Sequence, residues 1–296
     1  MPTPENPALA LAQEASSSLW MDAYRRLSKN KMALAGATFI LIEAFICLIT
    51  PWIAPYGFEQ QNLEFTLARP SFAHWLGTDT LGRDLFTRVL YGGRVSLMVG
   101  ILASLVSVVV GVIYGAVSGY AGGKIDSVLM RVVDILYALP FIFLVIILMV
   151  YFGRNIVLLF VALGLTEWLT MARIVRGQVI SLKQKEFIEA AVSMGIPTRF
   201  IVLRHLVPNT LGPVIVYLTL TIPSAILSEA FLSFLGLGVQ APMASWGTLI
   251  SSGVEVMEVA PWVLISPAIM LSLTLFSLNF LGDGLRDALD PKGAKD

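Results

Sequence analysis

Long apolar runs constrain the fold of this chain more than any other feature of its sequence. A run of about 20 apolar residues is long enough to cross a hydrocarbon core about 30 Å thick. Each run is expected to be a helix, because an isolated strand leaves its backbone polar groups unsatisfied in lipid. Such runs extend approximately over 32–54, 95–120, 127–152, 155–177, 210–235 and 261–282. The sequence therefore predicts an all-α integral membrane protein with six transmembrane helices.

The composition excludes several other classes of protein. Apolar residues make up 56% of the 296 positions and charged residues only 14%, against about 25% charged residues in a soluble protein. The 20 basic and 20 acidic residues cancel, so no net charge points to a nucleic acid or an acidic substrate. Cys47 has no partner for an internal disulfide, and the few histidines form no cluster. We therefore expect no metal site of ordinary ligand spacing.

The sequence contains no phosphate-binding loop. Gly122-Gly123-Lys124 comes nearest to the pattern G-x-x-x-x-G-K-[ST], but Ile125 follows the lysine and the spaced glycine is missing. The common metalloprotease and serine-hydrolase patterns are also absent. We expect no catalytic or cofactor-binding residue in this chain, and any energy from ATP must enter through another subunit.

The N-terminal segment, 1–31, is not expected to be a cleaved signal. Residues 1–18 are polar and carry no basic cluster, which indicates a disordered lead. A basic group precedes the run 32–54, which is too long for the apolar core of a signal peptide and has no small-residue cleavage site after it. The first run is therefore predicted to stay in the membrane.

Lysine and arginine are distributed unevenly between the two sides of the predicted helices. With the N-terminus in the cytoplasm, 15 of them fall on the cytoplasmic side and 5 on the outer side, as the positive-inside rule requires. The outer ones are Arg69, Arg83, Arg88, Arg94 and Arg154. Six spans then return the C-terminal tail, 286–296, to the cytoplasm.

Two connections between the spans are long. The outer segment, 55–94, offers helix-start residues (Thr78, Asp79 and Thr80) and then apolar residues at helical spacing (Leu81, Leu85, Phe86, Val89 and Leu90). This pattern predicts an amphipathic helix at the membrane surface. A five-helix core is expected over 95–285, with a cytoplasmic loop at about 183–208.

Small residues and prolines occur inside the spans. The second span carries Gly100, Ser104, Ser107, Gly111, Gly115 and Gly119 at spacings of three and four. Such a stripe permits the close approach of another helix, which would belong either to this chain or to a second subunit. Pro140, Pro223 and Pro267 predict kinks in the third, fifth and sixth spans.

The loop at 183–208 has the pattern of a helix, a sharp turn and a second helix. Gly195 can take the positive φ that ends the first helix, and Pro197 suits the first turn of the second. Pro208 is expected to end this second helix, whose apolar residues would face the bundle: Phe200, Ile201, Leu203 and Leu206. Such an elbow suits docking into a groove of a partner, although its periodicity alone fits an ordinary connecting loop equally well.

The same loop carries a spaced motif: three residues separate Glu189-Ala190-Ala191 from Gly195, and nine more precede His205, with Pro208 three positions further on. This motif resembles the EAA loop of binding-protein-dependent ABC importer permeases. His205 and Val207 stand where the wider family often has Ile and Leu, and the His form resembles the peptide and nickel branch. Three other stretches also resemble that branch: LGTDTLGRDL at 76–85, AFLSFLGLGVQAPMASWG at 230–247 and GDGLRDALDPK at 282–292. With the N-terminal RRLSKNKMAL, the chain from about residue 20 onward is similar to the C-type permease subunits of oligopeptide and dipeptide importers.

The resemblance implies the type I ABC importer permease fold and half of a translocation path for peptides delivered by a periplasmic binding protein. The residues that would couple the chain to an ATPase are Glu189, Ala190, Ala191, Gly195, His205 and Pro208. In this elbow Glu189 would be the polar contact, the alanines the close-packing surface and Gly195 the turn. The implied partners in a bacterial inner membrane are a second homologous permease, the binding protein and two cytoplasmic ATPase subunits that hold ATP and Mg. Nickel complexes, glutathione and opines stay open as substrates.

Acidic residues inside the predicted spans support a rival hypothesis. They are Glu43, Asp134, Glu167 and Glu229, and an intramembrane carboxylate is costly enough to suggest a function. A proton-coupled secondary transporter would use Glu167 or Glu229 as a relay, whereas a membrane anchor would have no transport path. The structural interpretation pairs Asp134 with Arg131 and turns the other three toward neighbouring helices or an aqueous cavity. Glu229, Pro223 and Glu167 stay candidates for a gate or a pore lining.

Overall fold

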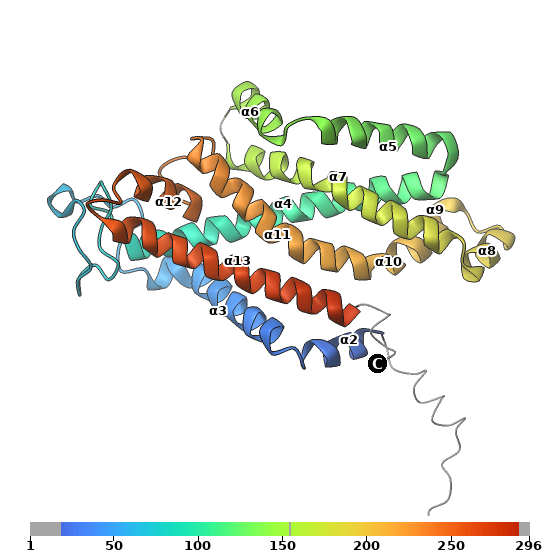
Figure 1. Ribbon diagram of the computed structural model, residues 1–296, viewed down its shortest axis with the longest axis horizontal. Coiled ribbons are helices and arrows are strands. Elements are labelled where there is room, and N and C mark those ends of the chain that lie inside the picture. The colour runs from blue at the N-terminus through green and yellow to red at the C-terminus, as the bar shows by residue number, and fades with distance from the viewer. Residues whose placement is uncertain (1–18, 154, 290–296) are drawn as a thin grey trace, which may run out of the picture.

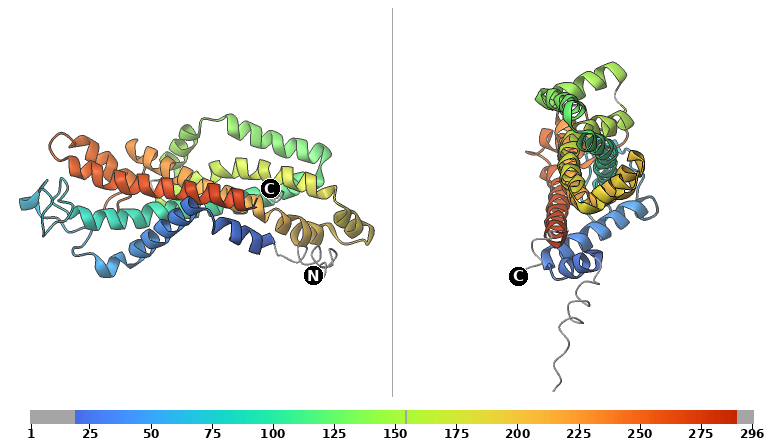
Figure 2. Two further views of the ribbon diagram at one scale, coloured as in Figure 1. Left: turned by 60° about the horizontal axis from the view of Figure 1, so that its bottom comes forward. Right: turned by 90° about the vertical axis from the view of Figure 1, so that its right-hand side faces the viewer.

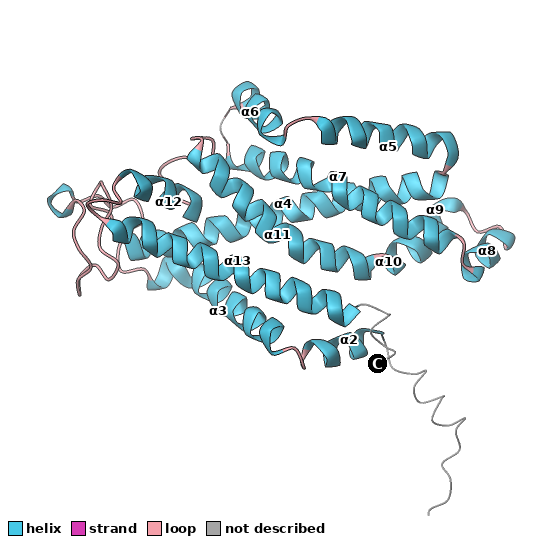
Figure 3. Cartoon of the chain, viewed as in Figure 1, coloured by secondary structure: helices cyan, strands magenta, loops and turns pink. Residues whose placement is uncertain are grey.

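Long helices run side by side along most of the molecule (Figure 1). The computed structural model describes residues 19–153 and 155–289; Arg154, the predicted N-terminal lead and the last seven residues of the tail lie outside this part. The helices are α2 (Leu19–Leu27), α3 (Lys31–Ile53), the 3-10 turn η1 (Leu63–Phe65), α4 (Leu85–Ala121), α5 (Gly123–Ala138), α6 (Phe141–Phe152), α7 (Ile156–Lys183), α8 (Glu186–Ser193), α9 (Thr198–Phe200), the π-helix η2 (Ile201–Leu206), α10 (Val207–Asn209), α11 (Leu211–Phe234), α12 (Trp246–Glu255) and α13 (Pro261–Leu289). No strand occurs among the described residues (Figure 3), and the all-α prediction is confirmed.

Five helices are long and apolar enough to cross a membrane, namely α3, α4, α7, α11 and α13. The predicted span at 127–152 is instead a pair, α5 and α6, whose axes are bent by 86°. The sequence predicts a kink at Pro140, but the helix breaks there: Leu139 is extended, and Pro140 precedes α6 as its N-cap. Proline donates no N–H and disfavours helical backbone in the residue before it. Counted as one broken crossing, the pair brings the number of spans to six.

The connections between the helices gather at two ends of the bundle. The segment between α3 and α4 lies beside α12 at one end, whereas α8 and α9 project from the other (Figure 1). The first described helix, α2, and the end of α13 lie toward the end that carries α8, and the two further views in Figure 2 agree. We call the end with α12 and the α3–α4 segment the loop end, and the end with α8 and α9 the elbow end. An even number of crossings accounts for this arrangement.

The helix α4 begins ten residues before its predicted start. No separate amphipathic helix forms over 78–90, so that prediction is wrong: the chain turns through 78–84, and α4 then starts at Leu85. The carboxylate of Asp84 accepts a hydrogen bond of 2.8 Å from the Thr87 backbone N–H and caps the helix. Leu85, Val89 and Leu90 are buried inside the protein and do not lie on a membrane surface.

The stripe of small residues packs α4 against other helices of the same chain, Gly100 against α11 and the later glycines against α7. A Cβ added at Gly115 would lie 2.4 Å from the carbonyl oxygen of Ala172, and one added at Gly119 would lie 2.9 Å from that of Arg176. Gly111 faces the side chain of Met171 in the same way. These contacts place the stripe within the subunit, the first of the two alternatives that the sequence left open.

Candidate functional site

The short helix α8 is anchored to the bundle by one face. Ile188 and Ala191 are 1% and 2% exposed and join a core cluster with residues of α7, η2 and α11. Their spacing of three residues places both on the same side of the helix. Ala191 therefore packs inward, whereas Ala190 and Glu189 lie on the exposed side. Of the EAA triplet, two residues are accessible to a partner.

Gly195 ends α8 in the conformation that the sequence predicts. Its φ is +70°, and no atom lies within 4 Å of the position that a Cβ would occupy. The Ile196 N–H donates to the Ala191 carbonyl at 3.1 Å, and the Gly195 N–H donates to the Val192 carbonyl at 2.9 Å. This is the Schellman pattern of hydrogen bonds, in which a glycine takes the left-handed position. Backbone geometry and not packing requires glycine at this turn.

The second arm of the elbow is a nearly continuous helical segment. Pro197 caps α9, and helical structure continues through the π-helix η2 and α10 to Thr210, directly before α11. Pro208 lies in the first turn of α10, so the prediction that it ends the helix is wrong. A proline is tolerated there because the first N–H groups of a helical turn need no partner within it. His205 lies in η2, where its carbonyl accepts a hydrogen bond of 2.6 Å from the Asn209 side chain.

The apolar residues of this second arm divide between two faces. Ile201 and Leu206 are 1% and 0% exposed, as predicted, and pack on the same core cluster as Ile188. Phe200 of α9 and Leu203 of η2 are exposed instead. For Leu203 the π-helix changes the face, because it turns less per residue than the α-helix assumed in the prediction.

Apolar side chains are also exposed around Glu189. They are Phe187, Val192, Met194, Phe200 and Leu203, and with Glu189 and Ala190 we call them the elbow surface. A group of exposed apolar residues at one end of a protein, next to charged ones, is typical of an interaction site. The elbow therefore presents a partly apolar surface on the outside of the bundle.

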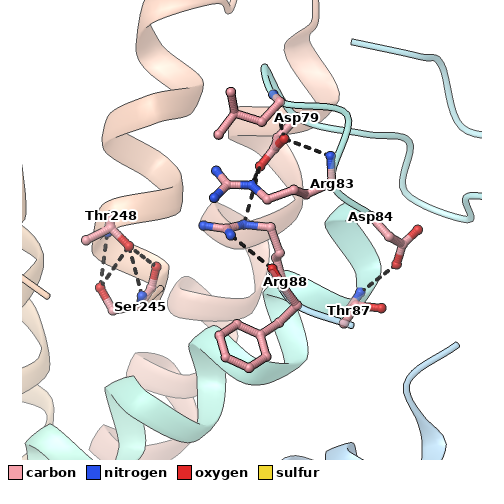
Figure 4. A network of polar contacts seen from close by, with 9 residues as sticks. Asp79, Arg83, Asp84, Thr87, Arg88, Ser245 and Thr248 are labelled. Carbon is pink, nitrogen blue, oxygen red and sulfur yellow. Dashed lines mark hydrogen bonds and ion pairs between the residues drawn. The ribbon is translucent and has the colours of Figure 1, made fainter. Parts of the chain in front are cut away.

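A network of buried charges closes the loop end (Figure 4). The carboxylate of Asp79 accepts hydrogen bonds from the backbone N–H groups of Leu81 and Arg83 and forms ion pairs with the side chains of Arg83, at 2.7 Å, and Arg88, at 3.4 Å. Arg88 is 5% exposed, and it also donates to the Phe58 carbonyl. The motif LGTDTLGRDL thus folds the outer segment onto the first turn of α4.

Asp79 was predicted to start a helix, and its role in this network was not predicted. Arg88 was the available signal, since an arginine among the apolar residues that lead into a predicted span needs a buried partner or access to water.

The candidate gate residue Glu229 is fully buried where α11 meets the start of α12. Its Oε1 accepts hydrogen bonds of 2.7 Å from the hydroxyls of both Ser233 and Ser245. Ser245 caps α12, and the neighbouring Trp246 donates from its indole N–H to the Val89 carbonyl. Glu229 therefore ties α11 to α12. Pro223 is buried inside α11 and does not break it.

The other intramembrane acids have different surroundings. Glu43 accepts a hydrogen bond from Thr274 of α13 and is buried. Glu167 is half-buried and accepts one from Ser224 of α11 at 2.9 Å. Asp134 pairs at 2.8 Å with Arg173 of α7 and not with Arg131, so the predicted pairing is wrong. The fold brings Asp134 closer to Arg173, which is distant in sequence, than to Arg131, which is near in sequence.

Two family models match the chain. Residues 107–295 match the binding-protein-dependent transport system inner membrane component, and residues 18–70 match the N-terminal transmembrane domain of oligopeptide transport permease C. The first match covers more than half of the chain and contains the elbow; the second contains α2, α3 and part of the outer segment.

Curated relatives extend the similarity to nearly the whole length. The oligopeptide transport system permease protein OppC of Escherichia coli (strain K12) is 55% identical over 93% of this chain and 92% of its own. The dipeptide transport system permease protein DppC of Bacillus subtilis (strain 168) is 49% identical over 94% of this chain and 87% of its own. Among solved structures, an inward-facing form of the MetNI methionine ABC transporter matches with a TM-score of 0.54 at 21% identity, over 70% of this chain and 96% of that one. The last likeness concerns the fold.

Proposed function

The chain belongs to the family of binding-protein-dependent transport system inner membrane components, and from this we propose that it forms half of the translocation path of an ATP-driven peptide importer. The family and the relatives are permeases, so the chain is a transport subunit and not an enzyme. Peptides are the proposed substrates because relatives at 55% and 49% identity are named for oligopeptide and dipeptide transport.

The single observation that carries the mechanism is the two-sided packing of α8. One face is fixed in the core by Ile188 and Ala191, and the other presents Glu189 and Ala190 outside the bundle. A helix held in this way cannot move without moving α7 and α11, because its buried residues share a cluster with both. In this proposal the elbow surface docks on a cytoplasmic ATPase subunit, with Glu189 as its polar contact.

The transport cycle follows from this connection. ATP and Mg bind between two ATPase subunits and draw them together; each elbow follows its ATPase, and the helices attached to it change the side on which the path is open. The other half of the path belongs to a second homologous permease. A periplasmic binding protein delivers the peptide at the loop end, where the outer segment and α12 lie together.

This mechanism fixes the orientation of the chain in a bacterial inner membrane. The elbow end and both chain termini face the cytoplasm, because the ATPase subunits are there. The excess of lysine and arginine on that side supports the same orientation.

A pair of charge reversals tests the coupling proposal. In the reconstituted importer Glu189→Lys is expected to reduce co-purification of the ATPase subunits and ATP-dependent peptide uptake at least tenfold, since charge pairs at a partly desolvated interface contribute a few kcal/mol. Glu64→Lys makes the same change at an exposed site of the loop end and is expected to leave the ATPase bound. Equal co-purification and uptake in both variants would show that α8 is an ordinary connection.

A further inference from the structure

The break between α5 and α6 lies beside an open cavity at the edge of the bundle, between this helix pair and α7. Its volume is about 290 Å³, and its walls come from both sides of the break and from α7 and α11. Leu139 and Phe141 line it at the break, Glu167 and Thr170 line it from α7, and Ser228 lines it from α11. Small-molecule sites start at about 300 Å³, so the cavity suits one end of a peptide better than a whole one.

The cavity lies at mid-membrane depth. Glu167 is eleven residues from the first residue of α7, about 17 Å along the helix axis, and a hydrocarbon core is about 30 Å thick. Irregular backbone such as that at Leu139 is tolerated at this depth only where it is covered by protein or lines an aqueous cavity.

Charged side chains beside the cavity indicate that this face is not covered by lipid. The side chains of Arg173 and Asp134 are 41% and 55% exposed although they pair with each other, and the Arg173 guanidinium lies 4.5 Å from the ring centre of Tyr137. Ionisable residues inside a membrane almost always face a bundle interior or a water-filled space. A second groove, between α4 and α7, shows the contrast, since its lining is wholly apolar: Leu102, Leu105, Val106, Val109, Val110, Val157, Phe160 and Val161.

Glu167 is the only ionisable acid in the cavity lining, and its hydrogen bonding is incomplete. It accepts one hydrogen bond, from Ser224, and forms no ion pair with any of the described residues. A carboxylate at this depth needs a positive partner or a proton. Thr170 and Ser228 line the same space, and each carries a hydroxyl group that can hydrogen-bond a polar ligand.

We propose that this cavity is a subsite of the translocation path that receives the N-terminal ammonium group of the transported peptide, with Glu167 as its acceptor. The inference rests on the proposed function and adds a recognition step within the membrane to it. An ammonium group supplies the charge and the N–H donors that Glu167 lacks, and the first peptide carbonyl lies within reach of the hydroxyls. The rest of the peptide extends past the exposed ion pair of Arg173 and Asp134.

The test compares two peptides in one importer. The complete complex in vesicles, with its binding protein, takes up a peptide with a free amino terminus or its N-acetylated form. We expect Glu167→Gln to reduce uptake of the free-amine peptide about tenfold, the scale of one lost charged hydrogen bond, with little change for the acetylated peptide. Glu167→Asp is expected to restore part of the difference. The binding protein is the same throughout, so its own preference cancels between permease variants.

Glu43→Gln is the matched control. Glu43 is also an intramembrane carboxylate that accepts a hydrogen bond from one hydroxyl, that of Thr274, but it lines none of the cavities described above. The ratio of the two uptake rates should be unchanged in this variant. Equal losses for both peptides in Glu167→Gln would assign a structural role to Glu167 and overturn the inference, as would unchanged uptake of both peptides.

A labelling experiment tests the cavity without relying on transport by the Glu167 variants. A cysteine at Ser228 should react with a cationic, water-soluble thiol reagent and be protected when peptide is transported, whereas a cysteine at Leu105 in the apolar groove should not react. Absence of labelling at Ser228, or labelling that peptide does not affect, would contradict the subsite. If the wild-type importer takes up neither peptide with ATP, the proposed function itself fails, and this outcome is distinct from the others.

Discussion

The two ends of the bundle differ in which side chains they bury and which they expose. At the loop end, charged groups are turned inward: Asp79, Arg88 and Asp84 are each at most 5% exposed and have partners within the chain. At the elbow end, apolar groups are turned outward, and Met194 and Leu203 are 72% and 68% exposed. The loop end exposes apolar side chains too, among them Leu63 and Phe72, but its buried charges are paired within the chain, whereas the elbow carries its exposed apolar groups on a short helix that projects from the bundle.

This difference shows where the chain depends on partners. Buried ion pairs and hydrogen bonds of this kind hold one arrangement of the backbone firmly, which suits the end where, in the proposed function, a binding protein docks. Exposed apolar residues on an anchored helix suit an end that another subunit covers. Substitutions at the two ends should therefore fail in different ways: at the loop end the protein unfolds, and at the elbow end the complex dissociates.

The largest expected effect is a difference in accessibility, because the two ends are predicted to lie on opposite sides of the membrane. A cysteine at Gln61 should react with an impermeant thiol reagent from the outer side only, and a cysteine at Gln184 from the cytoplasmic side only. Both positions are exposed, and the native Cys47 is buried and gives little background. Labelling of both cysteines from one side would show that the two ends do not lie across a bilayer from each other.

The next effect concerns the stability of the loop end. Asp79→Ala leaves Arg88 as a buried charge without its partner, and breaking a buried pair in this way costs about 3–5 kcal/mol. We expect a clearly lower midpoint of thermal unfolding for the purified complex in detergent. Glu59→Ala, an exposed change in the same segment, should stay within about 0.5 kcal/mol of wild type. A normal midpoint for Asp79→Ala would mean that the network is not what holds this end together.

A smaller effect is expected at the turn of the elbow. Gly195→Val places a β-branched residue at φ +70°, which costs about 1–2 kcal/mol of local strain. ATPase co-purification and uptake should fall, while the unfolding midpoint changes little because Gly195 has no packing contacts at its Cβ position. Asparagine tolerates the left-handed conformation, so Gly195→Asn should retain most of the uptake. Similar losses in both variants would show that any side chain at this position disturbs docking, and that backbone strain is not the cause.

The smallest effect on stability is expected on the elbow surface. Met194→Ser removes an apolar side chain that is 72% exposed, so the unfolding midpoint should stay within about 0.5 kcal/mol of wild type. Affinity for the ATPase subunits should nevertheless fall severalfold, as measured by titration of detached ATPase onto the permease pair. Leu63→Ser, at a residue 70% exposed at the loop end, is the control and should leave this affinity unchanged. A matching loss in the control would remove the distinction between the ends.

Much of the fold was predictable because hydropathy and length determine a membrane helix. The predicted runs 32–54 and 155–177 appear as α3 and as most of α7, and the turn at Gly195 was set by glycine chemistry alone. The break at Pro140 was not predictable in the same way. Proline inside an apolar run is compatible with a kink or a break, and which of them forms depends on whether neighbouring helices cover the freed backbone groups.

The errors in the sites have a common physical origin. Asp79 has the residue type of a helix cap, but Arg83 and Arg88 occupy its carboxylate and leave the cap to Asp84. Asp134 was assigned to Arg131, three positions away, whereas its partner Arg173 lies 39 positions along the chain. Local sequence gives the capacity of a side chain for interaction, and only the packed helices decide which partner it meets.

The length of α4 has a mechanical consequence. Its 37 residues extend about 55 Å, more than the 40–45 Å of a bilayer with its headgroup layers. Because glycines seat it directly on the backbone of α7, the two helices behave as one strut with little compliance between them. Since α8 follows α7 after only two residues, we expect a displacement of the elbow to reach the Asp84 cap through the paired helices α7 and α4. The close glycine contacts leave few side chains between the two helices whose repacking could absorb that displacement.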